Sequence, residues 1–459
     1  MLDKRIAQEV IDCALSTGGD FAEIFYEDRL NNRLNMRAGK VEGVNSGRIH
    51  GAGVRVYLGF QGVYVYTNDT SREGLLACAK RAASALHADS RITAKPLAAH
   101  EFVNIHPIDI RPSEAKAAAK IEKMRAAQGV LNQYNEVVQG MVGYTDSEQN
   151  VWIANSDGLY AHDRRTYSRF MVHAIASNGT ENQTGSASPG AHMGFELFDR
   201  TVDPEAAAHI AAKQAVTMLH APVCPAGVMP VVIDNGFGGV IFHEACGHSL
   251  EATSVAIGTS EFAGKLGEKI AADCVTAIDD GTMPNEWGSE NIDDEGTPTT
   301  KLVLIENGVL KNYMIDRLNS RRMQMPITGN GRRQDYSFAP TSRMRNTYIA
   351  AGNDDENEII ATMGDGLYAK SMGGGSVNPA TGEFNFSVSE GYLVKDGKIV
   401  HPVRGASLIG RGSEILTRID RVGKDMKMAQ GMCGSLSGSV PTNVGQPMIR
   451  VSSITVGGR

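Results

Sequence analysis

Two histidines and a glutamate lie close together in the stretch GGVIFHEACGHSLEA (238–252), namely His243, Glu244 and His248. This pattern is almost the zinc-protease signature H-E-x-x-H, in which histidines four positions apart share one helix face and bind one ion. Here the histidines are five positions apart, so a regular α-helix would point them about 140° away from each other. The spacing therefore indicates either no metal site or a helix that is distorted at this point.

Gly247, directly before His248, favours the distorted helix. A π-type turn of roughly 4.4 residues brings positions five apart to within about 50° of each other, and such turns are frequent at functional sites. Glu244 stands next to the first histidine, where the general base of a metal-dependent hydrolase must stand. These features favour a metal site at His243 and His248, with Glu244 as its general base, over the plain interpretation of a chance His-Glu pair whose histidines are ordinary hydrogen-bonded residues.

A catalytic zinc ion takes three protein ligands and leaves the fourth position to water, so the two histidines need a partner. The residues alone leave the choice open between a cysteine and a carboxylate. The cysteine is Cys433 in MAQGMCGSLSG, whose small neighbours allow close approach, although a buried inert thiol is the simpler interpretation. The carboxylates are Glu251, Glu268 and Asp273. Cys246, inside the motif, is expected to be structural.

The glycine-rich stretch SMGGGSVNPATGEF (371–384) has two interpretations. It lacks the phosphate-binding pattern G-x-x-x-x-G-K-[ST], so a nucleotide site is a weak hypothesis. A wide turn between two strands is the plain interpretation. The functional one is that Gly373, Gly374 and Gly375 let a peptide backbone lie along a sheet edge and bind through main-chain hydrogen bonds.

Charged residues cluster in a third stretch, GRRQDYSFAPTSRMRN (331–346), with Arg332, Arg333 and Asp335 at its start. In a β-rich context we expect these three side chains to form an ion-pair network at a domain or subunit contact. Binding of a substrate carboxylate is the alternative.

The elements that position these residues follow from length and pattern. A chain of 459 residues predicts two or three domains. Helices are expected over 3–17, after Thr70 or Ser71, over 113–132 and over 203–221, with strands between them, and prolines and a glycine mark a boundary at 221–230. Beyond it the chain is glycine-rich and strand-like, with hairpin turns at Asn307-Gly308 and Asp396-Gly397. Only the metal motif and DRLNSRRM are expected to be helical there.

The predicted fold class is α+β. N-terminal α/β modules precede a large, mostly antiparallel, curved β-sheet domain that carries the metal-binding helix. The expected domains are an N-terminal α+β domain over 1–100, a middle α+β domain over 101–222 and a C-terminal β-rich catalytic domain over 223–459.

Bulk properties exclude several other functions. The net charge is −7 and no basic cluster has interleaved aromatics, so no nucleic-acid partner is expected. No apolar run approaches the length of a bilayer span, so no membrane partner is expected either. The 6 cysteines are scattered without a C-x-x-C pair, which fits a reduced, cytoplasmic protein.

Five stretches resemble the TldD/PmbA family of zinc metalloproteases: HEACGH, GRRQDYSFAPTSRMRNTYI (331–349), GGGSVNPATGEFNFSV (373–388), PVRGASLIG (402–410) and GMCGSLSGSVPTNVGQPMIRVSSITVGG (431–458). The resemblance spans essentially the whole chain. The TldD-type subunit of that family keeps H-E-x-x-x-H and a late cysteine, whereas the PmbA (TldE) type lacks them. His243, Glu244, His248 and Cys433 are all present, so the chain resembles the catalytic subunit.

The resemblance implies Zn²⁺ as cofactor, with His243, His248 and Cys433 as its ligands. It further implies a cytoplasmic peptidase that cleaves unfolded or small polypeptides in an enclosed chamber, as a homodimer or as a heterodimer with a PmbA/TldE-like subunit. Glu244 would activate the attacking water. The alternative is a non-catalytic peptide-binding or assembly subunit whose zinc is structural.

Overall fold

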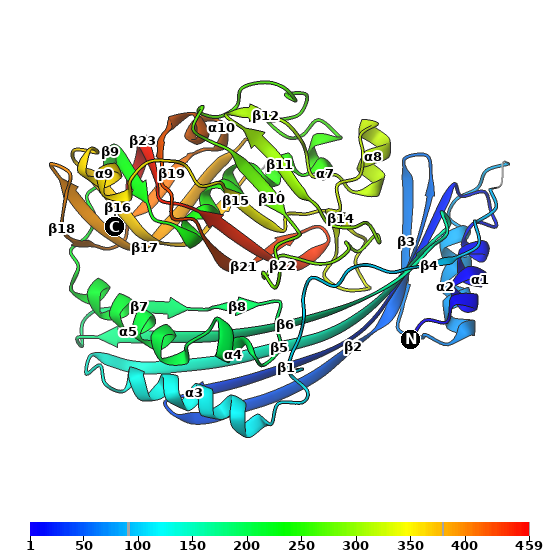
Figure 1. The fold of residues 1–459 in the computed structure, drawn as a ribbon, viewed down its shortest axis with the longest axis horizontal. Helices are drawn as coiled ribbons and strands as arrows, with labels where there is room; N and C mark the ends of the chain where they lie inside the picture. The colour runs from blue at the N-terminus through cyan, green and yellow to red at the C-terminus, as the bar shows by residue number, and fades with distance from the viewer. Residues whose placement is uncertain (90–91, 379–380, 459) are drawn as a thin grey trace.

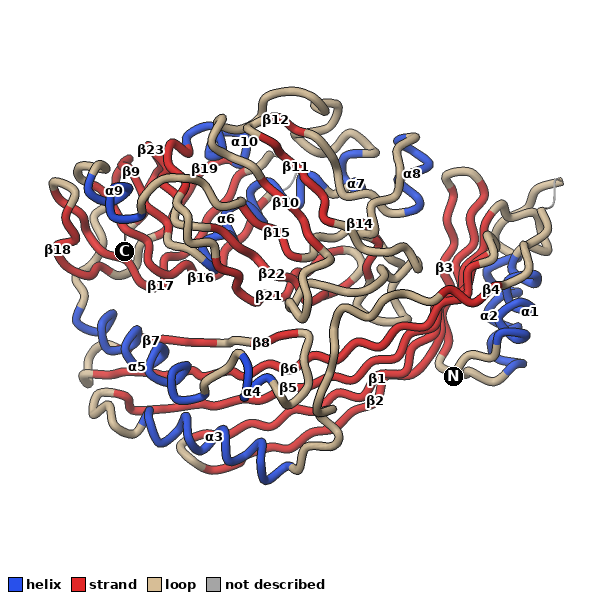
Figure 2. Tube along the Cα trace, in the orientation of Figure 1, coloured by secondary structure: helices blue, strands red, loops and turns tan. Residues whose placement is uncertain are grey.

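The computed structural model describes residues 1–89, 92–378 and 381–458. Its first half is dominated by one long, curved sheet with helices at both ends (Figure 1). The second half is a β-rich unit that lies on the concave side of this sheet (Figure 2). The fold class predicted from the sequence is confirmed.

The long sheet has the strand order β3-β2-β1-β5-β6-β4, with β7 and β8 also paired to β6. β1 pairs antiparallel with β5 from Glu23 opposite Asn155 to Arg37 opposite Met141, so the two predicted N-terminal modules share one sheet. The predicted division at residue 100 stays a prediction. The strands are β1 (Phe21–Arg37), β2 (Lys40–Leu58), β3 (Gln61–Thr67), β4 (Ala98–His100), β5 (Val137–Asn155), β6 (Leu159–Ser177), β7 (Asn182–Ala187) and β8 (Gly190–Ala191).

Helices cover the two ends of this sheet, where they bury apolar side chains at helical spacing. Asp203 caps α5 and Pro204 occupies its first turn, which is the expected start signal. Ser71 caps α2 by accepting a hydrogen bond from the backbone N–H of Gly74, which settles the predicted choice between Thr70 and Ser71. The helices are α1 (Lys4–Ala14), α2 (Arg72–Ala83), α3 (Ala117–Leu131), α4 (Leu197–Arg200) and α5 (Pro204–His220).

Two large sheets and the short antiparallel pair of β13 and β14 build the described part of the second half. One has the order β12-β11-β10-β15-β22-β21, and the other has the order β16-β9-β23-β19-β17-β18 with a further β16–β17 pairing that closes it on itself. The strands are β9 (Gly227–Ile233), β10 (Ala277–Asp280), β11 (Lys301–Glu306), β12 (Val309–Leu310), β13 (Gly331–Arg332), β14 (Thr341–Ser342), β15 (Asn346–Ile349), β16 (Gly366–Val377), β17 (Glu383–Lys395), β18 (Lys398–Val403), β19 (Ser407–Arg411), β20 (Ile419–Val422), β21 (Lys427–Ser435), β22 (Gly438–Gln446) and β23 (Ile449–Gly457).

The predicted hairpin turns are confirmed. Asn307 and Gly308 have φ of 48° and 80°, and Asp396 and Gly397 have φ of 47° and 70°, as a tight turn with two left-handed residues requires. DRLNSRRM contributes α8, but further short helices occur where none was predicted, because four- to six-residue turns leave little periodicity to detect. The helices are α6 (Val240–Phe242), α7 (Ala252–Val255), α8 (Arg317–Met323), α9 (Glu356–Ala361) and α10 (Gly412–Ile415).

The segment with the two histidines is buried in the main core of the second half, where Phe242, Ala245 and Cys246 are inaccessible to solvent. It packs against β15, β16 and β17, which come from both sheets. In the described part of the chain, no helix combines the length and hydropathy that a bilayer-spanning segment requires.

Candidate metal centre

The predicted distortion of the metal-motif helix is confirmed. Val240–Phe242 is α-helical, His243–Gly247 forms a π turn, and His248–Leu250 continues as a 3₁₀ turn. The backbone N–H of His248 donates to the carbonyl of His243, which is the i+5 hydrogen bond of a π turn. The two imidazoles consequently lie next to each other, edge to face, with ring centroids 5.1 Å apart.

Strand β21 supplies the third side chain. Nε2 of His243 lies 3.2 Å from Sγ of Cys433, and Nε2 of His248 lies 3.3 Å from it. The ligand atoms of the three residues all lie within 4.8 Å of one another. The structure thus brings together the three residues that the family resemblance implied as ligands.

This arrangement fits a zinc ion. Zn–N distances of about 2.0–2.1 Å and a Zn–S distance of about 2.3 Å in a tetrahedron require donor atoms about 3.3–3.7 Å apart, close to the distances seen. Two imidazoles and one thiolate also form a typical zinc ligand set. Among the described residues, nothing hydrogen-bonds to the buried Nδ1 of His243, whereas Nδ1 of His248 lies 3.1 Å from Oε2 of Glu251. Within the described part of the protein, His248 thus has a carboxylate at its Nδ1, whereas His243 has no hydrogen-bond partner at that atom.

The electrostatics favour a thiolate at Cys433. Burial alone would raise the pKa of this thiol, but the attraction and hydrogen bonds of His243 and His248 outweigh burial and hold the pKa well below its usual range. The pKa of His248 is raised well above its ordinary value, because Glu251 and Cys433 outweigh its burial. The thiolate is the form of cysteine that binds metal ions.

Glu244 stands at the edge of this cluster. Its Oε2 lies 3.7 Å from Nε2 of His248, and its side chain is 26% exposed, so it is accessible from solvent. Glu244, His243 and Cys433 line a cavity of about 230 Å³. A carboxylate beside the ligands and open to a cavity can exchange protons with a molecule bound there.

The other predicted ligands lie elsewhere. Glu268 is exposed, and Asp273, also exposed, pairs with Lys269 at 2.8 Å. Glu251 is buried and contacts the back of His248 instead of the ligand cluster. Cys246 is fully buried, and burial raises its pKa well above the ordinary value, as expected of a structural thiol.

Sequence reasoning missed two residues that support the ligands. Glu251 is a ligand candidate by its position, and its contact behind His248 was not predicted. Arg343 is buried, and its Nη2 donates to the backbone carbonyl of Cys433 while its Nη1 donates to that of Gly438. The contact between Glu251 and His248 could have been predicted from their spacing of three positions. Nothing in the sequence linked Arg343 to the hairpin of β21 and β22.

The glycines of the predicted substrate site lie in strand β16 and not in the turn that follows it. Gly374 and Gly375 line the same cavity as the metal ligands. Gly373 and Gly374 line a neighbouring cavity of about 620 Å³. Within the described residues, β9 pairs with β16 only at Leu367–Ala369, so the later part of β16 has one edge without a strand partner.

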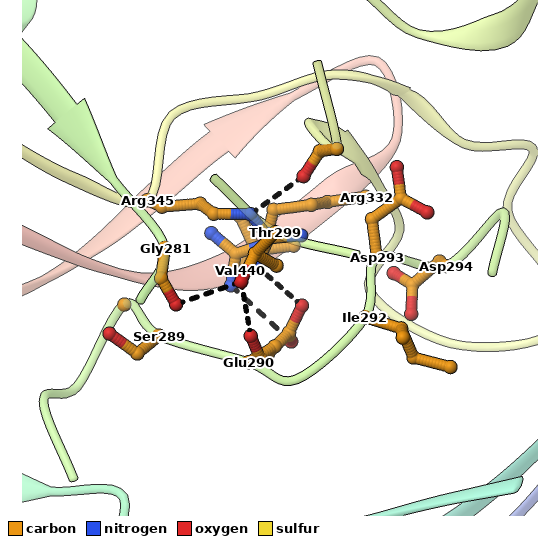
Figure 3. Close-up of polar contacts among 12 residues, drawn as sticks. Gly281, Ser289, Glu290, Ile292, Asp293, Asp294, Thr299, Arg332, Arg345 and Val440 are labelled. Carbon is orange, nitrogen blue, oxygen red and sulfur yellow. Dashed lines mark hydrogen bonds and ion pairs between the residues drawn. The ribbon is translucent and has the colours of Figure 1, made fainter. Parts of the chain in front are cut away.

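The predicted ion-pair network is confirmed for Arg332 and Arg333 but not, within the described residues, for Asp335. Arg333 Nη2 lies 2.9 Å from Glu23 of β1, and Arg55 of β2 lies 2.7 Å from Glu295, so the pairs join the long sheet to the second half. Arg332 and Arg345 converge on Glu290 (Figure 3). Asp335 instead accepts a hydrogen bond from the backbone N–H of Ser337 at 2.9 Å.

Three domain families match this chain. The PmbA/TldA metallopeptidase domain 1 matches residues 22–86, the central domain matches 110–219, and the C-terminal domain matches 226–458.

Similar proteins cover nearly the whole length. The metalloprotease TldD homologs of Buchnera aphidicola (strain APS) and Haemophilus influenzae are 33% and 34% identical to this chain, over 96% of it and 93% of each relative. A protein of Saccharolobus solfataricus named zinc metalloprotease TldD homolog is 28% identical, over 96% of this chain and 97% of its own.

Solved structures share the fold. A putative modulator of a DNA gyrase from Thermotoga maritima superposes with a TM-score of 0.81 at 21% identity, covering 99% of this chain and 100% of that one. TldE from Thermococcus kodakarensis superposes with a TM-score of 0.78 at 18% identity, with the same coverage.

Proposed function

The chain belongs to the PmbA/TldD metallopeptidase family, and on that premise we propose that it is a zinc-dependent peptidase that hydrolyses unfolded or small polypeptides. One observation carries the proposal. The ligand atoms of His243, His248 and Cys433 lie within 4.8 Å of one another, and Glu244 stands beside them at the wall of a cavity.

His243, His248 and Cys433 would hold the zinc ion, which supplies a Lewis acid that polarises the scissile carbonyl and acidifies a water molecule. Glu244 accepts a proton on its carboxylate as the water attacks, and then delivers it to the nitrogen of the leaving amine. The thiolate of Cys433 leaves a formal charge of +1 at the site, so it moderates the acidifying effect relative to three neutral imidazoles.

Strand β16 is the proposed binding edge for an extended substrate. Gly373–Gly375 lie along the edge that lacks a strand partner within the described residues, beside the cavities that lead to Glu244. A peptide laid along this edge would bind through main-chain hydrogen bonds, largely independent of its sequence. We further propose that the chain works as a dimer, with itself or with a PmbA/TldE-like subunit, and that the dimer encloses this region as a chamber.

The substitution Glu244→Gln tests the mechanism. Cleavage of an unfolded peptide should be abolished, because the amide of the new Gln side chain cannot accept the proton. The zinc content should stay near one per chain, because residue 244 is not one of the proposed ligands. Exposed Glu268→Gln is the matched control and should retain activity. Cleavage that survives Glu244→Gln would refute the mechanism and favour the alternative, a peptide-binding subunit with a structural zinc.

Co-expression tests the dimer. The zinc-loaded chain should be assayed for cleavage and for mass in solution, alone and with a PmbA-like subunit. A monomer that cleaves at full rate would exclude the proposed chamber.

A further inference from the structure

We propose that a cavity beside the metal centre, here called the arginine cavity, binds a carboxylate of the polypeptide substrate. The arginine cavity is lined by Arg29, Arg33, Arg332, Arg333, Tyr167 and Trp287, among others, and has a volume of about 510 Å³. The inference rests on the proposed peptidase function, to which it adds a substrate preference.

The arginine cavity adjoins the metal centre. Met432 lines it and also lines both the cavity of the metal ligands and the cavity along Gly373 and Gly374. Met432 directly precedes the ligand Cys433 on β21. Nε1 of Trp287 donates to the carbonyl of Gly431 at 2.8 Å, which fixes one wall of the arginine cavity to the strand that carries the ligand. The arginine cavity and the cavity of the candidate metal ligands therefore share Met432 as a common wall.

Arg332 lines this cavity, and its side chain is 1% exposed. Its Nη1 donates to the carbonyl of Met344 at 2.7 Å. Its Nε and Nη2 have no hydrogen-bond acceptor within the described part of the chain, because the nearest carboxylate, that of Glu290, is 3.6 Å from Nη2. Buried guanidinium donors are almost always hydrogen-bonded in folded proteins, so two unsatisfied donors at a cavity wall point to an absent acceptor.

The acids that line the arginine cavity are already engaged. Asp146 pairs with Lys120 at 2.6 Å, outside the lining. Glu290 lies 2.7 Å from Arg345 and 3.3 Å from Arg165, so Arg332 is its most distant cationic partner among the described residues (Figure 3). Over the same residues, Arg33 hydrogen-bonds only to the side-chain oxygen of Asn35, which carries no charge. The lining arginines Arg29, Arg165 and Arg333 have closer carboxylate partners, so within the described chain Arg33 and Arg332 are the ones short of a counter-charge.

The pKa of Arg332 reflects the same imbalance. Burial lowers it below its ordinary value, and the repulsion of Arg345 adds to this although Glu290 acts against it. By contrast, the pKa of Arg333 is raised, because Tyr64 and Glu23 outweigh its burial. An anion in the arginine cavity would supply Arg332 with the partner that Arg333 already has.

The lining of the arginine cavity combines apolar and charged side chains, which favours a residue of a peptide over a small inorganic ion. Tyr167 and Trp287 meet edge to face, with ring centroids 5.3 Å apart, so apolar surface adjoins the arginines. A guanidinium beside such a wall binds a carboxylate through charge-assisted, often bidentate hydrogen bonds. In a polypeptide this group is either the C-terminal carboxylate or an acidic side chain.

Three peptides separate these two sources. The first is an unstructured octapeptide without acidic residues and with a free C-terminus, the second is its C-terminal amide, and the third is the amide with one internal Glu. Binding is measured by calorimetry on the full chain with Glu244→Gln, at low ionic strength because salt screens the attraction. We expect at least one carboxylate peptide to bind about tenfold more tightly than the neutral amide.

Two variants locate the preference. Arg332→Gln and, to a smaller degree, Arg33→Gln should reduce the difference between the carboxylate peptide and the amide. Arg164→Gln is the matched control, since Arg164 is exposed and neighbours Arg165 on the opposite face of β6. It should leave the difference unchanged. Circular dichroism checks folding, and if Arg332→Gln fails to fold, Arg33→Gln and the three peptides decide the question.

Equal binding of all three peptides would overturn the inference, as would a carboxylate preference that survives both variants. The assay requires no cleavage, so its result is separate from that of the peptidase test. A carboxylate preference without any cleavage would support carboxylate binding in the arginine cavity and refute the peptidase proposal. Cleavage together with equal binding of the three peptides would support the peptidase proposal and refute carboxylate binding in the arginine cavity.

Discussion

His248 is contacted at both ring nitrogens, whereas His243 is contacted at one within the described residues. Nε2 of His248 lies 3.3 Å from the sulfur of Cys433, and Nδ1 lies 3.1 Å from Glu251. A carboxylate behind a ligating histidine fixes the tautomer and the ring orientation and increases the basicity of the ligand. At the scale of single residues, we therefore expect the proposed zinc centre to depend on Glu251 as well as on the three proposed ligands.

Glu251→Gln should weaken zinc binding by about tenfold or more, because the neutral amide orients His248 less firmly. Competition with a chelator of known affinity measures the change. Glu268→Gln removes an exposed carboxylate of the same type and serves as control. Unchanged zinc affinity in Glu251→Gln would show that the contact at Nδ1 is not a support for the metal.

Cys433→Ala should leave the purified chain without stoichiometric zinc, because two imidazoles alone are a poor set for this ion. Metal analysis of the purified protein is the measurement. Zinc retained near one per chain would identify a carboxylate as the third ligand, and Glu251 would then be the residue to replace next.

At the scale of elements, the π turn determines whether the two imidazoles converge. The turn packs against Met344, which lies just before β15. Gly247 is the point of contact, because a Cβ placed there would lie 2.2 Å from Sδ of Met344. Met344 is fully buried and has little room to move. The missing side chain at Gly247 therefore serves close packing.

Gly247→Ala should destabilise the protein by roughly 1–3 kcal/mol through overpacking, and zinc content should fall as the turn shifts. Urea denaturation and metal analysis measure the two effects. Gly129→Ala is the control, since Gly129 lies in α3, a Cβ placed there would meet no described atom within 4 Å, and alanine favours helix. A Gly247→Ala variant as stable as the Gly129→Ala control would contradict this account of the turn.

At the scale of the whole molecule, buried ion pairs join the long sheet to the second half. Glu23 of β1 accepts hydrogen bonds from Arg55 at 2.8 Å and from Arg333 at 2.9 Å. All three side chains are buried. These contacts hold the concave face of the sheet against the second half of the chain, and Arg333 also lines the arginine cavity.

Glu23→Gln should destabilise the molecule by about 3–5 kcal/mol, because it leaves two buried guanidinium groups short of a counter-charge. The midpoint of urea denaturation measures the loss. Glu9→Gln breaks the exposed pair with Arg72 and should cost less than about 1 kcal/mol. Equal effects of the two substitutions would mean that the buried pairs do not hold the two parts together.

The stability of the whole molecule should also depend on Asp316. Burial and the nearby charge of Glu295 raise the pKa of Asp316 from its ordinary 3.8 to about 6. The folded state therefore binds this proton more tightly than the unfolded state, so the carboxyl lowers stability as pH rises from about 4 to about 6 and the penalty persists above that range.

Asp316→Asn should remove this penalty. The variant should gain about 1–3 kcal/mol on the wild type between pH 4 and pH 7, since one pKa unit corresponds to about 1.4 kcal/mol. Urea midpoints of both proteins across this range provide the test. A constant difference between them at every pH would show that Asp316 does not titrate in this range.

Local sequence determined the features that depend on local physics. Asn-Gly and Asp-Gly pairs specify tight turns because both central residues must tolerate positive φ, and capping residues such as Ser71 and Asp203 place helix starts. The five-residue spacing of His243 and His248 with an adjacent Gly247 was enough to predict a distorted helix. The ordinary hydrophobic and turn patterns were enough for the α+β class.

Only the tertiary structure decided which distant groups meet. Cys433 is 185 positions from His248 and reaches it because β21 pairs with β22 in the sheet that borders the π turn. Gly373–Gly375 lie in a strand and not in a turn because β17 pairs with Met372 and Gly375, on either side of a bulge at Gly373 and Gly374. The contacts of Arg343 with Cys433 and of Arg332 with Glu290 likewise come from packing between segments far apart in the chain, and side-chain pairing of that kind leaves no periodic trace in a single sequence.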